Sequence, residues 1–199
     1  MRIATQDLRN AVARIQTGIA PVGAELNELD GKLGDGDLGV TLVNGFKNIS
    51  EQADDLPDDF GMALFTCAKL MTQVSGSSFG TLMATALMAA GKLAKGKSEI
   101  DTTEVAGLLQ AAQDAMIKRG GSATGDKTLL DSMNAIISAL NEAGDASLEH
   151  AEHAAEQALQ DFNGKVNKIG RARIFGDKTI GMDDPGMVAI LRLLTLMRG

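Results

Sequence analysis

The stretch LRNAVARIQTGIAPVGAELNEL, residues 8–29, decides the fold class. Its apolar side chains recur at alternating intervals of four and three residues, which places them on one face of an α-helix. They are Leu8, Val12, Ile15, Ile19, Val22, Leu26 and Leu29. Pro21 falls inside this pattern and is expected to kink the helix without ending it. The pattern therefore predicts one long amphipathic helix.

The same periodicity returns along the rest of the chain, in residues 64–74, 105–116 and 129–140. Two further segments, 81–95 and 187–197, are apolar on nearly all sides, which is typical of helices buried in the middle of a bundle. Together these patterns predict an all-α fold of about eight helices, arranged as an antiparallel up-and-down bundle or barrel.

Helix start signals agree with this division. Asp101 and Glu104 have the spacing of a capping box, and Asp184 followed by Pro185 is typical of an N-cap with proline in the first helical position. Surface connections are expected at Glu51–Phe60 and at Lys92–Ile100. Neither connection is long enough to divide domains, so residues 1–199 are expected to form a single domain.

Composition narrows the class of protein. The net charge of −7 provides no basic field for nucleic acid or an anionic membrane, so neither is expected as a partner. No apolar run approaches the roughly 20 residues that span a bilayer, and the first residues do not form a signal peptide. The single cysteine, Cys67, lies on an apolar stripe and is expected to be an inert core thiol in a reducing compartment. These features favour a cytoplasmic protein.

Glycine is the residue that a helical bundle does not explain. The chain has 23 glycines, and glycine is costly inside helices unless the backbone must bend or approach a ligand. Many of them gather in four loops between the helical stripes. These are LDGKLGDGDLG (29–39), SGSSFG (75–80), RGGSATGDKT (119–128) and GRARIFGDKTIGMDDPG (170–186). The chemistry of the protein is expected in these loops.

The first of these loops places three aspartates, Asp30, Asp35 and Asp37, within eight residues. The intervening glycines allow the carboxylates to converge, and converging carboxylates are hard oxygen ligands that suit Mg²⁺ or Ca²⁺. The spacing does not match an EF-hand. The alternative is a solvated acidic turn that only caps the next helix.

The other loops offer groups for an anion. SGSSFG opens onto a helix, so that backbone N–H groups and the hydroxyls of Ser77 and Ser78 could bind phosphate, although such turns are also common caps. Arg171, Arg173 and Lys178 add cations in the last loop, where surface salt bridges are the alternative. The pair of His150 and His153 lies on a polar helix and is interpreted as a solvated face.

Taken in order, LDGKLGDGDLG, SGSSFGTLMATA, GDKTLLDSM and GRARIFGDKTIGMDDPG resemble the nucleotide-binding L subunit of the dihydroxyacetone kinases. The resemblance covers essentially the whole chain. It implies an eight-helix antiparallel barrel whose loops at one end hold ADP or ATP through two Mg²⁺ ions.

The resemblance also implies roles for individual residues. Asp30, Asp35 and Asp37 would be the magnesium ligands, and Arg171 would be a catalytic residue that offsets phosphate charge. The nucleotide would be contacted by Leu38, Gly39, Val40, Thr41, Ser78, Phe79, Gly120, Leu129, Arg171, Asp184, Pro185 and Gly186. Many members of the family have His or Thr in place of Leu38, and Ser or Thr in place of Phe79, so phosphate contacts at these two positions would come from the main chain.

The implied function is phosphoryl transfer to dihydroxyacetone or a related short ketose such as erythrulose, with the ketose held by a separate K subunit. The protein would act only in complex with that subunit. ADP could stay bound and be recharged by a phosphotransferase-system phosphocarrier, or free ATP could exchange. Two alternatives are the nucleotide domain of a fatty-acid kinase and a non-catalytic nucleotide sensor that contacts a transcription regulator.

Overall fold

The computed structural model describes residues 1–74 and 76–199, and within them the chain forms eight α-helices. Their bounds are α1 Thr5–Leu33, α2 Leu38–Glu51, α3 Phe60–Val74, α4 Ser78–Ala94, α5 Val105–Gly120, α6 Leu129–Ala143, α7 Leu148–Asn163 and α8 Pro185–Arg198. Short 3-10 helices lie at η1 Ala53–Asp55, η2 Thr102–Glu104 and η3 Ala172–Thr179. The all-α prediction is confirmed.

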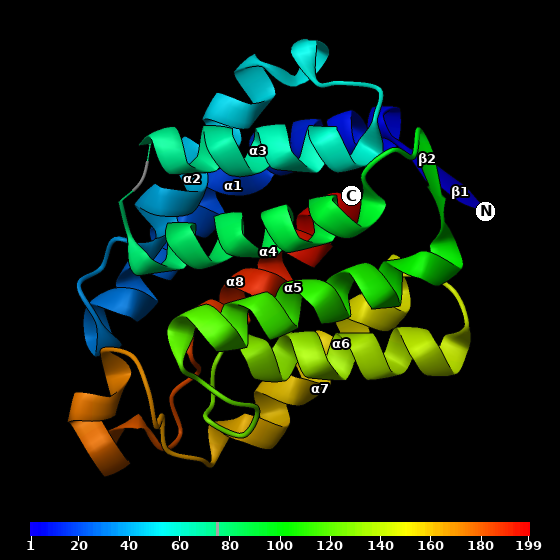
Figure 1. Ribbon diagram of the computed structural model, residues 1–199. Coiled ribbons are helices and arrows are strands. Elements are labelled where there is room, and N and C mark those ends of the chain that lie inside the picture. Colours follow the sequence, from blue (N-terminus) through cyan, green and yellow to red (C-terminus); the bar gives the residue numbers. More distant parts are fainter. Residues whose placement is uncertain (75) are drawn as a thin grey trace.

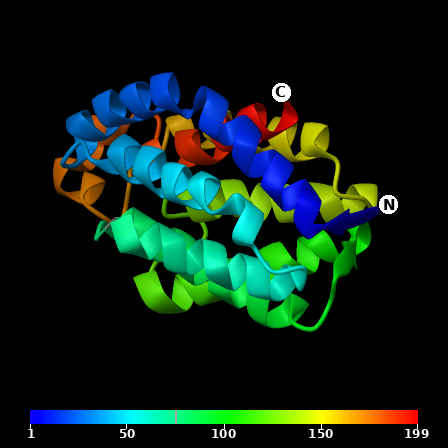
Figure 2. The ribbon, with the colours of Figure 1, turned by 90° about the horizontal axis from the view of Figure 1, so that it is seen from above.

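The helices follow one another around a ring. Each α-helix packs against the next in sequence, and α8 packs against both α7 and α1, which closes the ring. α8 also contacts α6, so it sits partly inside the ring (Figure 1). The view from above in Figure 2 shows α1 running along one side of the molecule and changing direction near its middle, where Pro21 lies.

The predicted apolar face of α1 lies in the core. Val12, Ile15, Ile19 and Leu26 are at most 4% exposed and pack with residues of α2, α3 and α8. α1 continues through Pro21 to Leu33, as the periodicity predicts.

One expectation was incomplete and one was wrong in detail. The connection Lys92–Ile100 contains a strand, β2 (Glu99–Asp101), which pairs antiparallel with β1 (Arg2–Ala4). Residues 95–98 are exposed, as expected of a surface connection, and Ile100 at the end of the segment is buried in this ribbon. α4 is not buried on all sides, because Met88 and Leu93 are about half exposed. α4 is a member of the ring that packs mainly on α3 and α5, so part of its surface stays exposed.

The start signals are confirmed. Asp101 and Glu104 form a capping box at η2, directly before α5, and the Asp184 side chain caps α8 ahead of Pro185. Within the described residues, no helix combines the length and apolar composition needed to cross a bilayer. The four glycine-rich loops meet at one end of the ring, at the left of Figure 1, so the fold brings the candidate site residues to one place.

Candidate functional site

The three aspartates of the first loop form a cluster at this end of the ring. Asp30 lies in the last turn of α1, Asp35 in the following loop and Asp37 at the N-cap of α2. One carboxylate oxygen from each lies within 4.8 Å of the others. Asp35 and Asp37 are exposed and Asp30 is half-buried, so the cluster opens to solvent. Three carboxylates this close together could hold a divalent cation.

The backbone of the loop explains the convergence. Gly36 has a φ of +74°, a conformation that glycine adopts without strain and that turns the chain back toward Asp30. The Asp30 carboxylate accepts hydrogen bonds from the backbone N–H groups of Asp37 at 3.0 Å and Leu38 at 3.3 Å. Burial, together with the neighbouring Asp35 and Asp30 carboxylates, raises the pKa of Asp37 above its usual value. Such a cluster favours an added cation.

Arg171 reaches the same cluster from the opposite end of the sequence. Its guanidinium forms an ion pair with the Asp35 carboxylate, although its side chain is 63% exposed. Arg171 is the N-cap residue of η3, and η3 also contacts α1. The predicted cation of the last loop therefore lies beside the predicted metal ligands. A guanidinium in this position can offset anionic charge at the carboxylates.

The start of α2 lies unusually close to α1. A Cβ at Gly39 would lie 1.9 Å from the Gly23 carbonyl oxygen, so only glycine allows this approach. The backbone N–H of Val40 donates to Asn27 Oδ1 at 3.1 Å. Leu38 and Gly39 are buried, whereas the Val40 side chain is half exposed. The close packing fixes the first turn of α2 beside the aspartates.

The second loop joins the first through two hydroxyls. Thr41 Oγ1 donates to Ser77 Oγ at 2.9 Å, and Ser77 caps α4 by accepting from the backbone N–H of Gly80. Ser78 is exposed in the first turn of α4, while Phe79 packs into the core. Ser75, the first residue of the SGSSFG loop, lies outside the described residues. Ser77 is a possible anion ligand by its sequence pattern, and its contact with Thr41 is a feature that the sequence does not predict.

Residues from the third and fourth loops pack against one another. Leu129, the first residue of α6, is buried, and its Cβ would lie 3.4 Å from a Cβ placed on Gly186 in α8. Phe79 packs in the same apolar cluster as Leu129. Gly120 ends α5 and is exposed, with Leu82 of α4 beside it. The starts of α4, α6 and α8 therefore share one packed base beneath the loops.

Asp184 differs from the other aspartates, because both of its carboxylate oxygens accept hydrogen bonds from the protein. Oδ1 accepts from the backbone N–H of Met187 at 3.0 Å, and Oδ2 accepts from Asn167 Nδ2 at 2.9 Å. Burial raises its pKa to about 6, against the hydrogen bonds, which lower it. Pro185 and Gly186 are buried. The side chain of Asp184 therefore shapes the last loop and the start of α8.

Two other residues that the sequence analysis missed lie behind the loops. Lys127 is 1% exposed and Asn167 is 2% exposed. Lys127 belongs to the GDKT segment and directly precedes Thr128, the N-cap of α6. Its polar neighbours in the sequence are typical of an exposed loop, so its burial is not predicted. Asn167 stands in a loop without any distinctive pattern. Their buried partners come from distant segments, which a single sequence does not indicate.

Five other residues were singled out in the sequence: two histidines, two further cations of the last loop and the cysteine. His150 and His153 are exposed on α7, and His150 lies 3.6 Å from the Asp145 carboxylate. Arg173 and Lys178 are also exposed. Cys67 is buried, and burial raises its pKa to about 12, which makes it a poor nucleophile.

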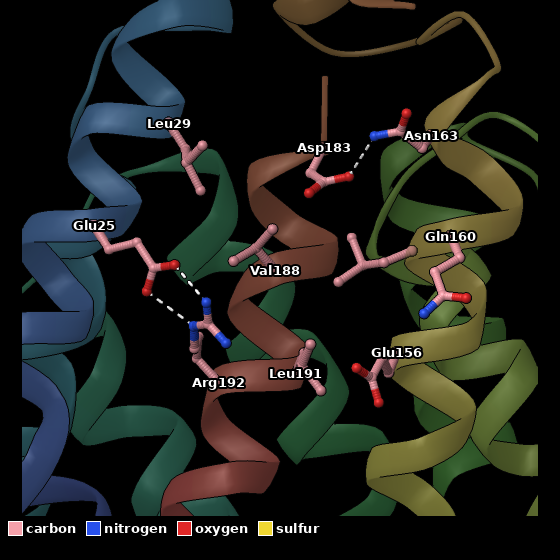
Figure 3. A pocket seen from close by; sticks show the side chains of 10 residues that line it. Glu25, Leu29, Glu156, Gln160, Asn163, Asp183, Val188, Leu191 and Arg192 are labelled. Carbon is pink, nitrogen blue, oxygen red and sulfur yellow. Dashed lines mark hydrogen bonds and ion pairs between the residues drawn. The ribbon is translucent and has the colours of Figure 1, made fainter. Parts of the chain in front are cut away.

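A separate cavity of about 430 Å³ lies between α1, α7 and α8 (Figure 3). Arg192 crosses it to form a bidentate ion pair with Glu25, with N–O distances of 2.9 and 2.6 Å. At its upper end in Figure 3, Asn163 Nδ2 donates to Asp183 Oδ1 at 2.9 Å. Asp30, Asp35 and Asp37 do not line this cavity, so it is distinct from the carboxylate cluster.

The fold and the cluster define a class of protein: a ring of helices with a carboxylate cluster and an arginine among the loops at one end. Residues 32–199 match the DAK2 domain. The chain therefore belongs to the DAK2-domain family, which confirms the resemblance found in the sequence.

Named relatives agree with this assignment. The ADP-binding subunit DhaL of the PEP-dependent dihydroxyacetone kinase of Escherichia coli is 26% identical over 86% of this chain and 85% of its own length. The L-erythrulose 1-kinase of Mycolicibacterium smegmatis is 28% identical over 94% of this chain. The chain spans only 34% of the length of that kinase.

A solved structure has the same fold. The dihydroxyacetone kinase of C. freundii, in complex with AMP-PNP and Mg²⁺, superposes with a TM-score of 0.74 at 24% identity. The match covers 97% of this chain and 33% of that one. It supports the helical ring as a recurring domain in larger kinases.

Proposed function

We propose that this chain is the nucleotide-bearing subunit of a kinase for dihydroxyacetone or a related short ketose such as erythrulose. The observation that supports the proposal is the cluster of Asp30, Asp35 and Asp37, with oxygens within 4.8 Å, paired with Arg171. The names of the relatives agree, since they describe an ADP-binding subunit and an erythrulose kinase.

The donor set fits magnesium. Mg²⁺ prefers carboxylate oxygens and binds through a few of them plus substrate phosphates. Three carboxylates and one guanidinium leave a net charge of −2, which would repel the phosphates of a free nucleotide. We therefore infer that ADP or ATP binds with Mg²⁺, and that Asp30, Asp35 and Asp37 hold two ions. The metal would supply neutralisation of phosphate charge.

The residues of this chain would position the nucleotide. Arg171 would turn from Asp35 toward the transferred phosphoryl group and act as the catalytic residue, because a fixed guanidinium stabilises charge that develops in the transition state. Leu38, Gly39, Val40 and Thr41 would present the first turn of α2 to the phosphates, and Ser78 and Phe79 would present that of α4. The helix N-termini favour anions at these points.

The remaining nucleotide contacts would come from the packed base of the site. Leu129 and Gly186 lie against each other, and Gly120 lies beside α4. We propose that these residues, with Asp184 and Pro185, border the nucleoside. Because the Asp184 carboxylate is occupied by protein donors, its contribution would come from the shape of the turn.

The partner and the phosphoryl donor form the second half of the proposal. Residues 1–199 would act as a single domain in the cytoplasm and meet a K subunit that holds the ketose. A phosphotransferase-system phosphocarrier or free ATP would supply the phosphoryl group, and a transcription regulator is a further candidate partner. The word "subunit" in the name of the DhaL relative supports a separate substrate-binding chain.

The test is reconstitution. The purified chain is mixed with a K subunit of a characterised dihydroxyacetone kinase and dihydroxyacetone or erythrulose. One mixture contains MgATP, a second contains MgADP with a phosphorylated phosphotransferase-system phosphocarrier, and the ketose phosphate is measured in both. Product that requires both chains would support the proposal. Nucleotide binding without product in any mixture would favour the nucleotide sensor, and a chain that binds no nucleotide would contradict both.

A further inference from the structure

Lys127 is a buried lysine whose ammonium group donates hydrogen bonds to backbone carbonyls of the protein. Its ammonium donates three hydrogen bonds, to the carbonyl oxygens of Asn163 at 3.2 Å, Lys165 at 2.8 Å and Thr179 at 2.9 Å. An ammonium has three N–H donors, so all of them are used. Lys127 therefore has no donor left for a phosphate, and any effect on a ligand must act through the segments that it holds.

The three carbonyls belong to the two ends of one long connection. Asn163 ends α7, Lys165 follows it, and Thr179 ends η3. Between Lys165 and Thr179 lies Arg171, which pairs with Asp35. A single side chain from the loop before α6 thus closes the connection that carries the arginine of the candidate site.

The backbone of Lys127 binds the same connection. Its carbonyl oxygen accepts from Asn167 Nδ2 at 2.9 Å, and Asn167 Nδ2 also donates to Asp184. Asn163, whose carbonyl accepts from the ammonium, donates its side-chain amide to Asp183 (Figure 3). Lys127 is thereby linked to Asp183 through Asn163 and to Asp184 through Asn167.

The conformation of Lys127 adds to this evidence. Among the described residues, Lys127 is the non-glycine residue with a positive φ, at +61°. Such a conformation costs about 1 kcal/mol or more and persists only where the surroundings enforce it. Desolvation lowers the pKa of the Lys127 ammonium, against the attraction of Asp184 and Asp183. A buried lysine therefore occupies a backbone conformation that glycine would adopt with less strain.

We infer that Lys127 is a positioning residue, which fastens the segment 163–184, and with it Arg171 and the first turn of α8, to the loop before α6. The inference rests on the proposed nucleotide-binding function and deepens it, because it names a buried group that joins the segment carrying Arg171 to the loop before α6.

The test compares Lys127→Met, which keeps the chain length and removes the ammonium, with Lys168→Met. Lys168 is the matched control, because it also donates to a loop carbonyl, Gly125 O at 2.8 Å, but its side chain is 64% exposed. Lys127→Gly is the second variant, since it removes the ammonium and also relieves the positive φ. It replaces Lys127→Met if the latter loses its helical circular dichroism.

Two readouts are needed. Amide hydrogen exchange in residues 163–184 should rise in the Lys127 variant and stay at the wild-type rate in Lys168→Met. In the Lys127 variant, MgADP affinity and kcat with a K subunit should fall by about 10-fold to 100-fold. Losses of this size are typical when a residue that orients a ligand-binding side chain is removed. Binding of Mn²⁺ alone to Asp30, Asp35 and Asp37 should stay within about 2-fold, because these ligands lie outside the fastened segment.

A general loss of folding would lower Mn²⁺ binding and MgADP binding together, so equal losses would overturn the inference. Unchanged exchange in 163–184, or raised exchange with unchanged MgADP affinity, would also overturn it. A wild-type protein that binds no MgADP would instead contradict the proposed function, and amide exchange alone would then decide whether Lys127 orders this segment.

Discussion

The first and the last loop of the candidate site both carry aspartates, but their carboxylates have different surroundings. Asp35 and Asp37 are exposed and lie beside Asp30, so their oxygens point to a common space. Asp184 is surrounded by donors of the protein, Met187 N–H and the Asn167 amide. An aspartate in a family motif can therefore either offer its carboxylate to a ligand or stabilise the loop. The difference is whether protein donors already bind both of its carboxylate oxygens.

The largest effect is expected in the first loop. Replacing both Asp35 and Asp37 by Asn removes two charged oxygen ligands, so MgADP affinity should fall by more than about 100-fold. Isothermal titration calorimetry measures this, with Asp54→Asn in η1 as the exposed control. Stability should not fall, since the change relieves repulsion among three carboxylates. A double variant that binds MgADP like the wild type would contradict the metal assignment.

Arg171→Met tests the ion pair between the first and the last loop. Loss of the guanidinium should lower kcat with a K subunit by about 100-fold. Binding of Mn²⁺ alone should stay equal or tighten, because the cation that competes for Asp35 is gone. The neighbouring exposed Arg173→Met is the control. Weaker Mn²⁺ binding in Arg171→Met would show that the arginine builds the carboxylate cluster instead of competing for it.

Asp184→Asn tests the buried carboxyl of the last loop through the pH dependence of the unfolding free energy. The folded-state pKa of Asp184 is raised from 3.8 to about 6, so between these pH values the folded protein binds more protons than the unfolded chain. Stability from this group is present below pH 4 and is lost as the pH rises to 6. The wild type should therefore lose roughly 1–3 kcal/mol relative to Asp184→Asn between pH 4 and pH 7.

Urea unfolding of both proteins at each pH measures this difference. A gap in unfolding free energy that does not change with pH would contradict the buried carboxyl. Mn²⁺ affinity should be the same in both proteins, and a large loss in Asp184→Asn would remove the distinction between the two loops.

The smallest effect is expected at the contact between the first and second loops. Thr41→Val removes the hydrogen bond to Ser77 and should cost about 1 kcal/mol of unfolding free energy. MgADP affinity should change by no more than about 3-fold, because the main chain of α2 remains. Thr17→Val, which removes an exposed hydroxyl that donates to Ala13 O, is the control. A larger loss of affinity would indicate that the hydroxyl itself meets the nucleotide.

Local patterns in the sequence were sufficient for the helices and for the first loop. The spacing of Leu8 to Leu29 predicts α1, and the short separation of Asp30, Asp35 and Asp37 predicts their convergence, because both depend on residues close in sequence. The β1–β2 ribbon escaped prediction because it joins residues about 97 positions apart, as in the pair Ile3 and Ile100. Similarly, α4 is apolar enough for burial, but which of its faces is left exposed depends on how the other helices pack.

The site beyond the first loop also depends on distant contacts. Arg171 was predicted as a cation in the last loop, yet its pairing with Asp35 comes from the way η3 folds back against α1. Lys127 reads as an ordinary surface lysine within GDKT, and its burial follows from carbonyls that lie 36 to 52 residues further along the chain. A single sequence does not specify such partners.

Native mass spectrometry of the purified protein tests the central claim most directly. Spectra are recorded with and without Mg²⁺, and with ADP, with ATP or with neither, for the wild type and for Asp35→Asn/Asp37→Asn. The account predicts a wild-type species that carries ADP with Mg²⁺ and a double variant that carries neither. Retention of ADP after dialysis would favour a bound coenzyme, and exchange would favour free ATP. A wild type that ignores both nucleotides, or a double variant that binds them equally, would contradict the account.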